Sequence, residues 1–151
     1  MKRRLSALLC AALLAGSLTA CRGSFDSLDD ITDEMLRSGR SSYLVIHWSS
    51  STRNGTEYHA KWGNMNGYQR LFTLPAAGPG SAVLTYTVDD PGEGYRVVLL
   101  DADGTLTDLT EGDNDLTLPR GAASVFLAAV ETSGEFTLSR SSDSGMTMSA
   151  D

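Results

Sequence analysis

The two histidines of this 151-residue sequence lie in segments on either side of Asn54-Gly55, and both segments alternate polar with apolar residues. The hairpin pairing that matches apolar residues sets Leu44 against Trp62, Ile46 against Ala60 and Trp48 against Tyr58. It also places His47 opposite His59 on the polar face, with Glu57 two residues away, and cross-strand Cβ atoms lie about 5 Å apart. Two imidazoles and a carboxylate so placed predict a Zn²⁺ or Cu²⁺ site; the alternative is a polar face that meets solvent.

Carboxylates form a second candidate site. Nine of them fall between Asp89 and Asp115, accompanied by the single cation Arg96. Clustered oxygen ligands suit Ca²⁺, which takes six to eight of them. The candidate ligands are Asp101, Asp103, Asp113 and Asp115. The glycine of Asp-Ala-Asp-Gly comes too early for an EF-hand, and Asp-Gly also suits a hairpin turn, so solvated turns are the alternative.

Aromatic side chains are the third candidate, because exposed Trp and Tyr bind sugar rings. Trp48, Trp62 and Tyr58 share the apolar face of the expected hairpin. Core packing is the main interpretation of that position, and carbohydrate binding is the alternative.

Motifs of the common enzyme classes are absent from the sequence. There is no G-x-S-x-G, no P-loop and no H-E-x-x-H, and the glycine pairs near residues 78–80 and 92–94 are not followed by the helix of a phosphate-binding loop. A catalytic triad would have to use His47 or His59, and no serine lies in a nucleophile turn. We therefore expect a protein that is not an enzyme, with hydrolase activity as the less favoured alternative.

Short alternating segments separated by turn residues dominate the region that holds these candidates. Gly, Pro or Asn occurs every eight to twelve residues, and no long helix interrupts the pattern. An antiparallel β-sandwich, jelly-roll-like, is the architecture typical of such a pattern. The expected strands are Tyr43–Ser49, Thr56–Gly63, Tyr68–Leu74, Ala82–Val88, Tyr95–Leu100, Thr105–Leu109, Leu116–Leu118, Ser124–Glu131 and Glu135–Ser139.

The expected sandwich occupies residues 42–140, and the flanking regions differ from it. In residues 21–41, Phe25, Leu28, Ile31 and Met35 recur at helical spacing, with Ser24 placed to cap a short amphipathic helix and Gly39 to stop it. We expect this helix to lie near a membrane or to pack on the sandwich. The tail, residues 141–151, has no periodicity and is expected to be disordered.

The first 20 residues have the form of an export signal. Three basic residues precede an uncharged stretch from Leu5 to Ala20, which is shorter than the roughly 20 apolar residues of a membrane span. Leu18, Thr19, Ala20 and Cys21 then match every position of the lipobox, so the segment resembles a bacterial lipoprotein signal peptide. The resemblance implies cleavage before Cys21, a diacylglyceryl thioether on its thiol and acylation of the new amino terminus with a fatty acid such as palmitate. The alternative is an ordinary secretory signal with a chance cysteine.

Cleavage at that point would change both the thiol content and the charge of the chain. Cys10 would leave with the signal, so Cys21, already alkylated, would be the one cysteine left and no disulfide could form. The mature chain would keep nine of the 12 basic residues and all 19 acidic residues, which gives it a formal charge of −10. Such a chain is not expected to bind nucleic acid or to rely on electrostatic attraction to anionic lipid, since both need a basic face.

Residues 82–139 carry a second resemblance. The order YRVVLLDADG, LPRG and SVFLAAVETSGEFTLS is similar to small jelly-roll or sandwich domains of uncharacterised bacterial lipoproteins and of pre-peptidase C-terminal-type domains. It departs from their pattern at Ala123–Val125, where an aromatic residue usually follows the glycine. The resemblance implies a non-catalytic β-domain. We therefore expect a lipid-anchored protein of the cell membrane or outer membrane, outside the cytoplasm, that binds an envelope protein or a glycan.

Overall fold

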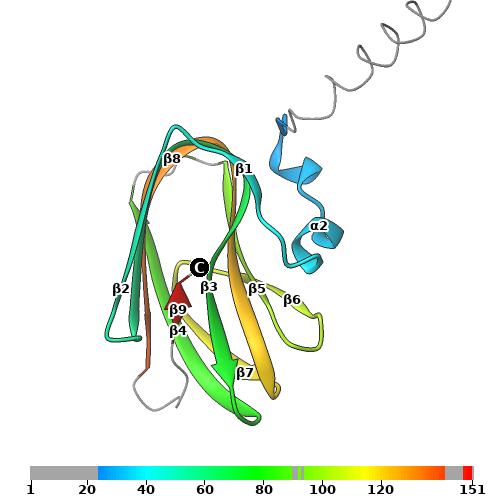
Figure 1. Ribbon diagram of the computed structural model, residues 1–151, viewed down its shortest axis with the longest axis vertical. Coiled ribbons are helices and arrows are strands. Elements are labelled where there is room, and N and C mark those ends of the chain that lie inside the picture. The colour runs from blue at the N-terminus through cyan, green and yellow to red at the C-terminus, as the bar shows by residue number, and fades with distance from the viewer. Residues whose placement is uncertain (1–23, 90–91, 93, 142–147, 151) are drawn as a thin grey trace, which may run out of the picture.

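The computed structural model describes residues 24–89, 92, 94–141 and 148–150, and within them it is an antiparallel β-sandwich, as predicted (Figure 1). Two short helical turns, η1 (Leu28–Asp30) and α2 (Asp33–Arg37), precede the strands. The strands are β1 (Ser42–Leu44), β2 (His47–Arg53), β3 (Glu57–Ala76), β4 (Gly80–Asp89), β5 (Tyr95–Leu100), β6 (Leu106–Leu109), β7 (Gly112–Leu118), β8 (Gly121–Arg140) and β9 (Ser149–Ala150).

Two 20-residue strands, β3 and β8, pair along their whole length and pass from one layer of the sandwich into the other. Sheet I contains β2, β4, β7, residues 57–62 of β3 and residues 134–140 of β8. Sheet II contains β1, β5, β6, β9, residues 65–76 of β3 and residues 121–130 of β8. Figure 1 shows these two layers side by side.

A bend in both long strands replaces two turns that the sequence pattern predicts. The expected strands leave a gap between Gly63 and Tyr68 and another between Glu131 and Glu135. Asn66-Gly67 and Ser133-Gly134 lie in these gaps, and their residue types suit turns, but each pair lies within a continuous strand. The register between β3 and β8 shifts between Trp62 and Asn66, and the backbone of Asn64 and Glu131 has positive φ values of 47° and 54°. A shift in register leaves extra, unpaired residues in a strand, which is a β-bulge. A bulge bends a strand without ending its pairing. The turn residues therefore mark the place where the chain changes layers.

The hairpin of β2 and β3 is present, but its predicted register is wrong. Trp48 pairs with Trp62, His47 with Gly63 and Ser51 with His59. Asn54 and Gly55 both have positive φ, and Thr56 N–H donates to the Arg53 carbonyl at 3.0 Å, which is the geometry of a type I′ turn. That turn sets the register four residues away from the one that matches apolar side chains. The same side chains still face the same sides, because the shift is even.

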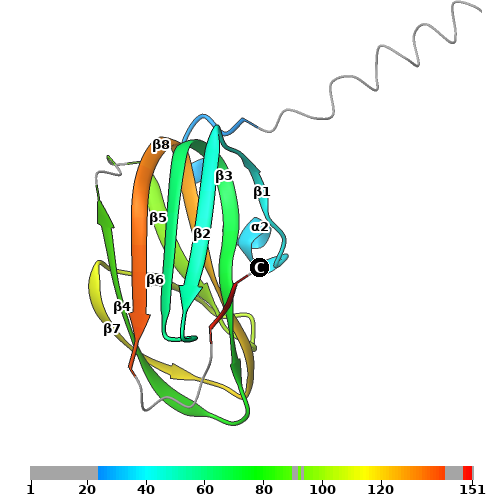
Figure 2. The ribbon, with the colours of Figure 1, turned by 60° about the vertical axis from the view of Figure 1, so that its left-hand side comes forward.

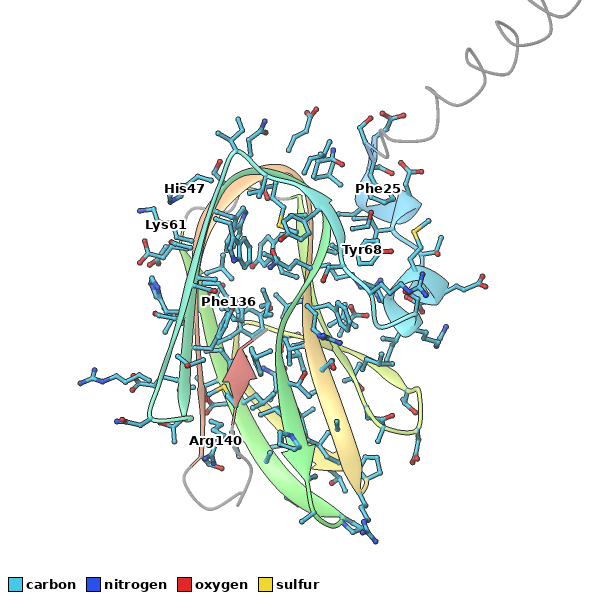
Figure 3. The ribbon with its side chains drawn as sticks, in the orientation of Figure 1. Phe25, His47, Lys61, Tyr68, Phe136 and Arg140 are labelled. Carbon is cyan, nitrogen blue, oxygen red and sulfur yellow. The ribbon has the colours of Figure 1, made fainter. Side chains whose placement is uncertain are left out.

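Aromatic rings fill the space between the sheets. Tyr58 and Phe72 pack with ring centroids 5.0 Å apart, and Phe136 lies 5.4 Å from Tyr86. Figure 3 shows Phe136 between the two layers. Trp62 is 2% exposed, and its indole nitrogen lies 3.4 Å from the hydroxyl of the buried Thr132. Aromatic packing of this kind joins the two sheets in one main core.

Tyr86 provides a titration test of this interior. Its hydroxyl donates to the Leu109 carbonyl at 3.0 Å, and burial, with smaller contributions from Tyr95 and Glu111, raises the pKa of Tyr86 to about 12. A pKa raised in the folded state contributes stability that is complete below pH 10.0, the ordinary tyrosine value, and is lost as the pH rises through about 12. We expect ultraviolet titration to show a tyrosine step near pH 12 that Tyr86→Phe removes. Identical curves for the two proteins would contradict this burial.

Residues 24–38, the N-terminal segment, cover the outer face of sheet II (Figure 1). Ile31 and Leu36 are 3% and 0% exposed, and they pack with Tyr68, Val98 and Phe126 in a second apolar cluster. Of the two predicted placements, near a membrane or packed on the sandwich, the structure shows packing on the sandwich.

The helix within this segment differs from the predicted one. It breaks into η1 and α2, because the Thr32 hydroxyl accepts from Met35 N–H at 3.4 Å and starts a new helix. Ser24 is thus not the cap, and Leu36 rather than Met35 is buried. Gly39 follows the helix at φ 69°, as its stop signal predicts.

The tail is partly ordered, contrary to the prediction for residues 141–151. Ser149 and Ala150 form β9, which pairs with Thr73 and Phe72 of β3. Met148 is 4% exposed, belongs to the main core and donates its N–H to the Gly55 carbonyl at 3.1 Å. Residues 142–147 and Asp151 lie outside the described residues.

Candidate functional site on the outer face of sheet I

The outer face of sheet I is the broad polar surface of the described sandwich. Strand alternation sends every second side chain of β2, β3, β8, β4 and β7 away from the core, as their burial patterns show. Whereas the N-terminal segment covers sheet II, no described element covers this face (Figures 1 and 2). Its polar side chains are His47, Ser49, Ser51, Arg53, Glu57, His59, Lys61, Thr85, Thr87, Asp89, Asp113, Asp115, Thr117, Glu135, Thr137 and Ser139.

Glu135 is the centre of a charged cluster on this face. Its two carboxylate oxygens lie 2.7 Å from His59 Nε2 and 3.5 Å from Lys61 Nζ. The hydrogen bond with His59 lowers the pKa of Glu135, and Lys61 adds to that effect. The side chains of His59 and Glu135 are 43% and 39% exposed, so solvent screens the pair and its net contribution to stability is small.

A shallow hollow of about 190 Å³ lies beside this cluster. It is lined by Ser51, Arg53, Glu57, Tyr58, His59 and Thr137. Ser51 lies opposite His59 in the strand register, but no described serine hydroxyl donates to His59, whose hydrogen bond is made with Glu135. The arrangement can therefore exchange hydrogen bonds with a polar group, but it lacks the nucleophile and base contact of a triad.

The pKa of Glu135 gives a local test of the cluster. Because it is lowered in the folded state, the contribution of Glu135 to stability is present above the ordinary glutamate pKa and is lost as the pH falls through the folded value. We expect ¹³C NMR of the side-chain carboxyl to show titration below the usual glutamate range. His59→Gln should move that pKa back upward, since the first contributor to the shift is removed. An unchanged Glu135 pKa in that variant would contradict the geometry.

The structure does not bring the predicted metal ligands together. His47 lies opposite Gly63, four residues along β3 from His59, and Glu57 pairs with Arg53. In the described part of the chain, no group of three His, Cys, Asp or Glu side chains is placed to hold a metal ion. The register of the type I′ turn is the reason, because it slides His47 past His59.

The predicted calcium ligands are divided between two places in the fold. Asp101 lies in the turn between β5 and β6, where its Oδ1 accepts from the N–H groups of Asp103 and Thr105, both at 2.9 Å. Asp113 and Asp115 lie on β7 in sheet I, and Asp113 accepts from the Thr85 hydroxyl at 2.7 Å. Asp101 thus holds a turn and Asp113 bonds across a strand pair, and the described carboxylates form no group of three that could hold a metal ion.

The aromatic candidates belong to the core. Trp62 and Tyr58 are buried, and Trp48 packs partly buried against the same cluster and near Tyr43. The core-packing interpretation is confirmed for these residues, and they form no stacking surface on the outer face of sheet I.

Sequence reasoning missed Glu135 and Lys61. Glu135 meets His59 from 76 residues away along the chain, and no short motif records that distance. Period-two alternation around residues 57–61 and 135–139 places these side chains outward, but only the pairing of β3 with β8 makes them neighbours.

The lipobox residues Leu18, Thr19, Ala20 and Cys21 lie outside the described residues. Among the residues that the structure describes, no helix has the length and apolar character needed to cross a membrane.

No family model and no curated protein matches this chain. Solved structures similar to it include Drosophila melanogaster CENP-C bound to CAL1, with 14% identity, coverage of 72% of this chain and 91% of that chain, and a TM-score of 0.34. A cupin domain from Bordetella pertussis shares 15% identity over 74% of this chain and 97% of its own, with a TM-score of 0.26. Procruciferin, an 11S globulin from Brassica napus, shares 17% identity over 68% of this chain and 27% of its own, with a TM-score of 0.28.

Proposed function

We propose that this protein is a lipid-anchored component of the bacterial cell envelope, a non-catalytic module that presents the outer face of sheet I to a partner. The observation that carries the proposal is the placement of the N-terminal segment. This segment begins three residues after the lipobox cysteine in the sequence and packs on sheet II, which leaves the polar face of sheet I free of described elements.

The lipobox supplies the anchoring half of the proposal. Leu18, Thr19, Ala20 and Cys21 follow an uncharged segment with a basic start, which is the arrangement that a lipoprotein signal requires. Two or more acyl chains at Cys21 would hold the protein stably, since each buried methylene contributes about 0.8 kcal/mol and one chain alone gives only reversible binding.

The chemistry of the outer face of sheet I supports a polar partner. Serine and threonine hydroxyls, the His59–Glu135–Lys61 cluster and the carboxylates of β7 provide both donors and acceptors. Because its Trp and Tyr residues pack inward, this face offers hydrogen bonds and ion pairs rather than an apolar platform. A folded envelope protein with a mixed-charge surface fits this chemistry best, and a glycan is the second candidate because of the hydroxyl-rich strands.

Site-specific photocrosslinking in intact cells tests the proposal. A photoreactive amino acid replaces Thr87, an exposed residue of β4 that pairs with Thr137 in sheet I, and the matched control replaces Thr107, an exposed threonine on β6 of sheet II. We expect one dominant crosslinked protein from position 87 and none from position 107. Two outcomes would contradict a binding role for this face. One is the same crosslinked products from both positions. The other is no product from position 87, together with a thermal midpoint of the protein that added glycans leave unchanged.

A further inference from the structure

Apolar side chains are exposed at one end of the sandwich. Leu44 and Ile46, at 55% and 79%, are the most exposed large hydrophobic residues that the structure describes. Tyr43 beside them is 38% exposed. All three lie in β1 or in the connection from β1 to β2. Single exposed apolar residues are common on proteins, but three within four positions form a patch that indicates an interaction surface. We call residues 43–46 the apolar tip.

The backbone holds the apolar tip in place. Leu44 pairs with Asn66, His47 pairs with Gly63, and Ile46 N–H donates to the Gly63 carbonyl at 2.9 Å. Val45 turns inward and packs against the main core. The outward direction of Leu44 and Ile46 is therefore built into the β1–β2 connection and does not depend on a loose loop.

The chain that follows Cys21 arrives at the same end of the molecule. Ser24 lines one hollow together with Leu44, Val45 and Ile46. Phe25 is fixed there, because Asn66 Oδ1 accepts from its N–H at 2.7 Å and Asn66 Nδ2 donates to its carbonyl at 2.8 Å. Three residues of extended chain span at most about 11 Å, so Cys21 cannot lie farther than that from Ser24.

We propose that the apolar tip contacts the membrane beside the acylated Cys21, with Leu44 and Ile46 in the interfacial layer of the bilayer. This inference rests on the proposed lipid anchor. An anchor about 11 Å or less from Ser24 keeps the tip at the surface, and interfacial segments bury their apolar side chains about 5–10 Å deep at the headgroup boundary. A second contact beside the lipid restricts the rotation that a single flexible attachment would allow.

Charge indicates which kind of lipid surface the tip fits. The charged side chain that lines the hollow with Ser24, Leu44 and Ile46 is the carboxylate of Glu131, and Asp26 lies next to Phe25. Anionic headgroups attract basic segments, so these carboxylates favour contact with neutral headgroups. The contact is therefore apolar and does not require anionic lipid.

The contact also sets the orientation of the outer face of sheet I. Figures 1 and 2 show the β1–β2 connection at one end of the long axis and the β3–β4 connection at the other. With the apolar tip on the membrane, the strands of sheet I stand away from the surface, and their outer face is open sideways to a partner held in the same membrane.

Fluorescence quenching by brominated lipids tests the proposal on the full-length lipidated protein in phosphatidylcholine vesicles. Ile46→Cys provides a thiol for an environment-sensitive dye, since the other cysteine of the mature chain is acylated. The matched control is Ala77→Cys, an exposed position in the β3–β4 connection at the opposite end. Ile46 is largely exposed, so its replacement leaves the fold intact, and Leu44→Cys gives an independent second probe.

We expect bromines placed near the lipid carbonyls to quench the dye at positions 46 and 44, with loss of most of its fluorescence, and to leave the dye at position 77 unaffected. The mass of the same protein reports the acyl chains on Cys21. Acylated protein without quenching at positions 46 and 44, or with equal quenching at position 77, overturns the tip contact and leaves the anchor standing. A protein that carries no acyl chain overturns both proposals.

Discussion

Gly67→Ala is expected to lower the free energy of unfolding by about 3 kcal/mol or more, because a side chain at this position meets backbone on the paired strand. An added Cβ would lie 2.2 Å from the Ser42 carbonyl oxygen and 2.6 Å from Tyr43 Cα, and φ is +130°. Neither backbone atom can move without separating β1 from β3. Chemical denaturation followed by circular dichroism measures the loss.

Gly39→Ala is the matched control for that experiment. Gly39 also has a positive φ, +69°, but an added Cβ there meets nothing within 4 Å. Its replacement should cost only the strain of a left-handed residue, about 1 kcal/mol. Equal effects of the two substitutions would show that β1 does not lie against Gly67, and the position of the apolar tip would then be in error.

Leu36→Ala is expected to destabilise the protein by about 2–5 kcal/mol, the range for removing a fully buried leucine side chain. Leu36 is 0% exposed in the cluster that joins α2 to Val98 and Phe126 of sheet II. The neighbouring Met35 is 36% exposed, so Met35→Ala should change the stability by less than about 0.5 kcal/mol. Thermal or urea unfolding compares the two variants.

This pair of variants tests more than one side chain. If the N-terminal segment were a free tether, both substitutions would have the same negligible effect. A difference between adjacent positions of one short helix can arise only if that helix is docked with Leu36 inward. The docked segment belongs to the folded domain and begins three residues after Cys21 in the sequence, so the proposed anchor is attached close to the fold.

The alternation of polar and apolar residues predicted the sandwich and most of its inward positions. Tyr58, Ala60 and Trp62 were expected on the apolar side, and all are buried. Period-two patterning carries this information because a strand in a two-layer sandwich has one face in the core. What it cannot distinguish is a turn from a bend, and so β3 and β8 were each expected as two strands.

The candidate site was predicted in part for a related reason. The face on which His47, His59 and Glu57 lie was predicted, because face depends only on parity. Their neighbours were not, because register depends on the Asn54-Gly55 turn and an even slip leaves the polar pattern unchanged. Glu135 could not be found at all from local sequence, since its contact with His59 joins distant parts of the chain.

Helical spacing gave the right interaction for the N-terminal segment but the wrong local structure. Phe25, Leu28 and Ile31 do pack against sheet II. The Thr32 cap restarts the helix and rotates the following turn, so that Leu36 takes the inward position expected for Met35. A capping residue within an apolar repeat is thus a signal that the repeat alone does not contain.

Lipid anchoring is tested by the mass of the amino-terminal peptide of the mature protein, purified from the membranes of a lipoprotein-processing bacterium. We expect a chain that begins at Cys21 and carries a diacylglyceryl group on the thiol with a further acyl chain on the amino terminus. A mature chain that begins at another residue, or one that begins at Cys21 with a free thiol, would contradict lipid anchoring and with it the proposed place of this protein in the cell.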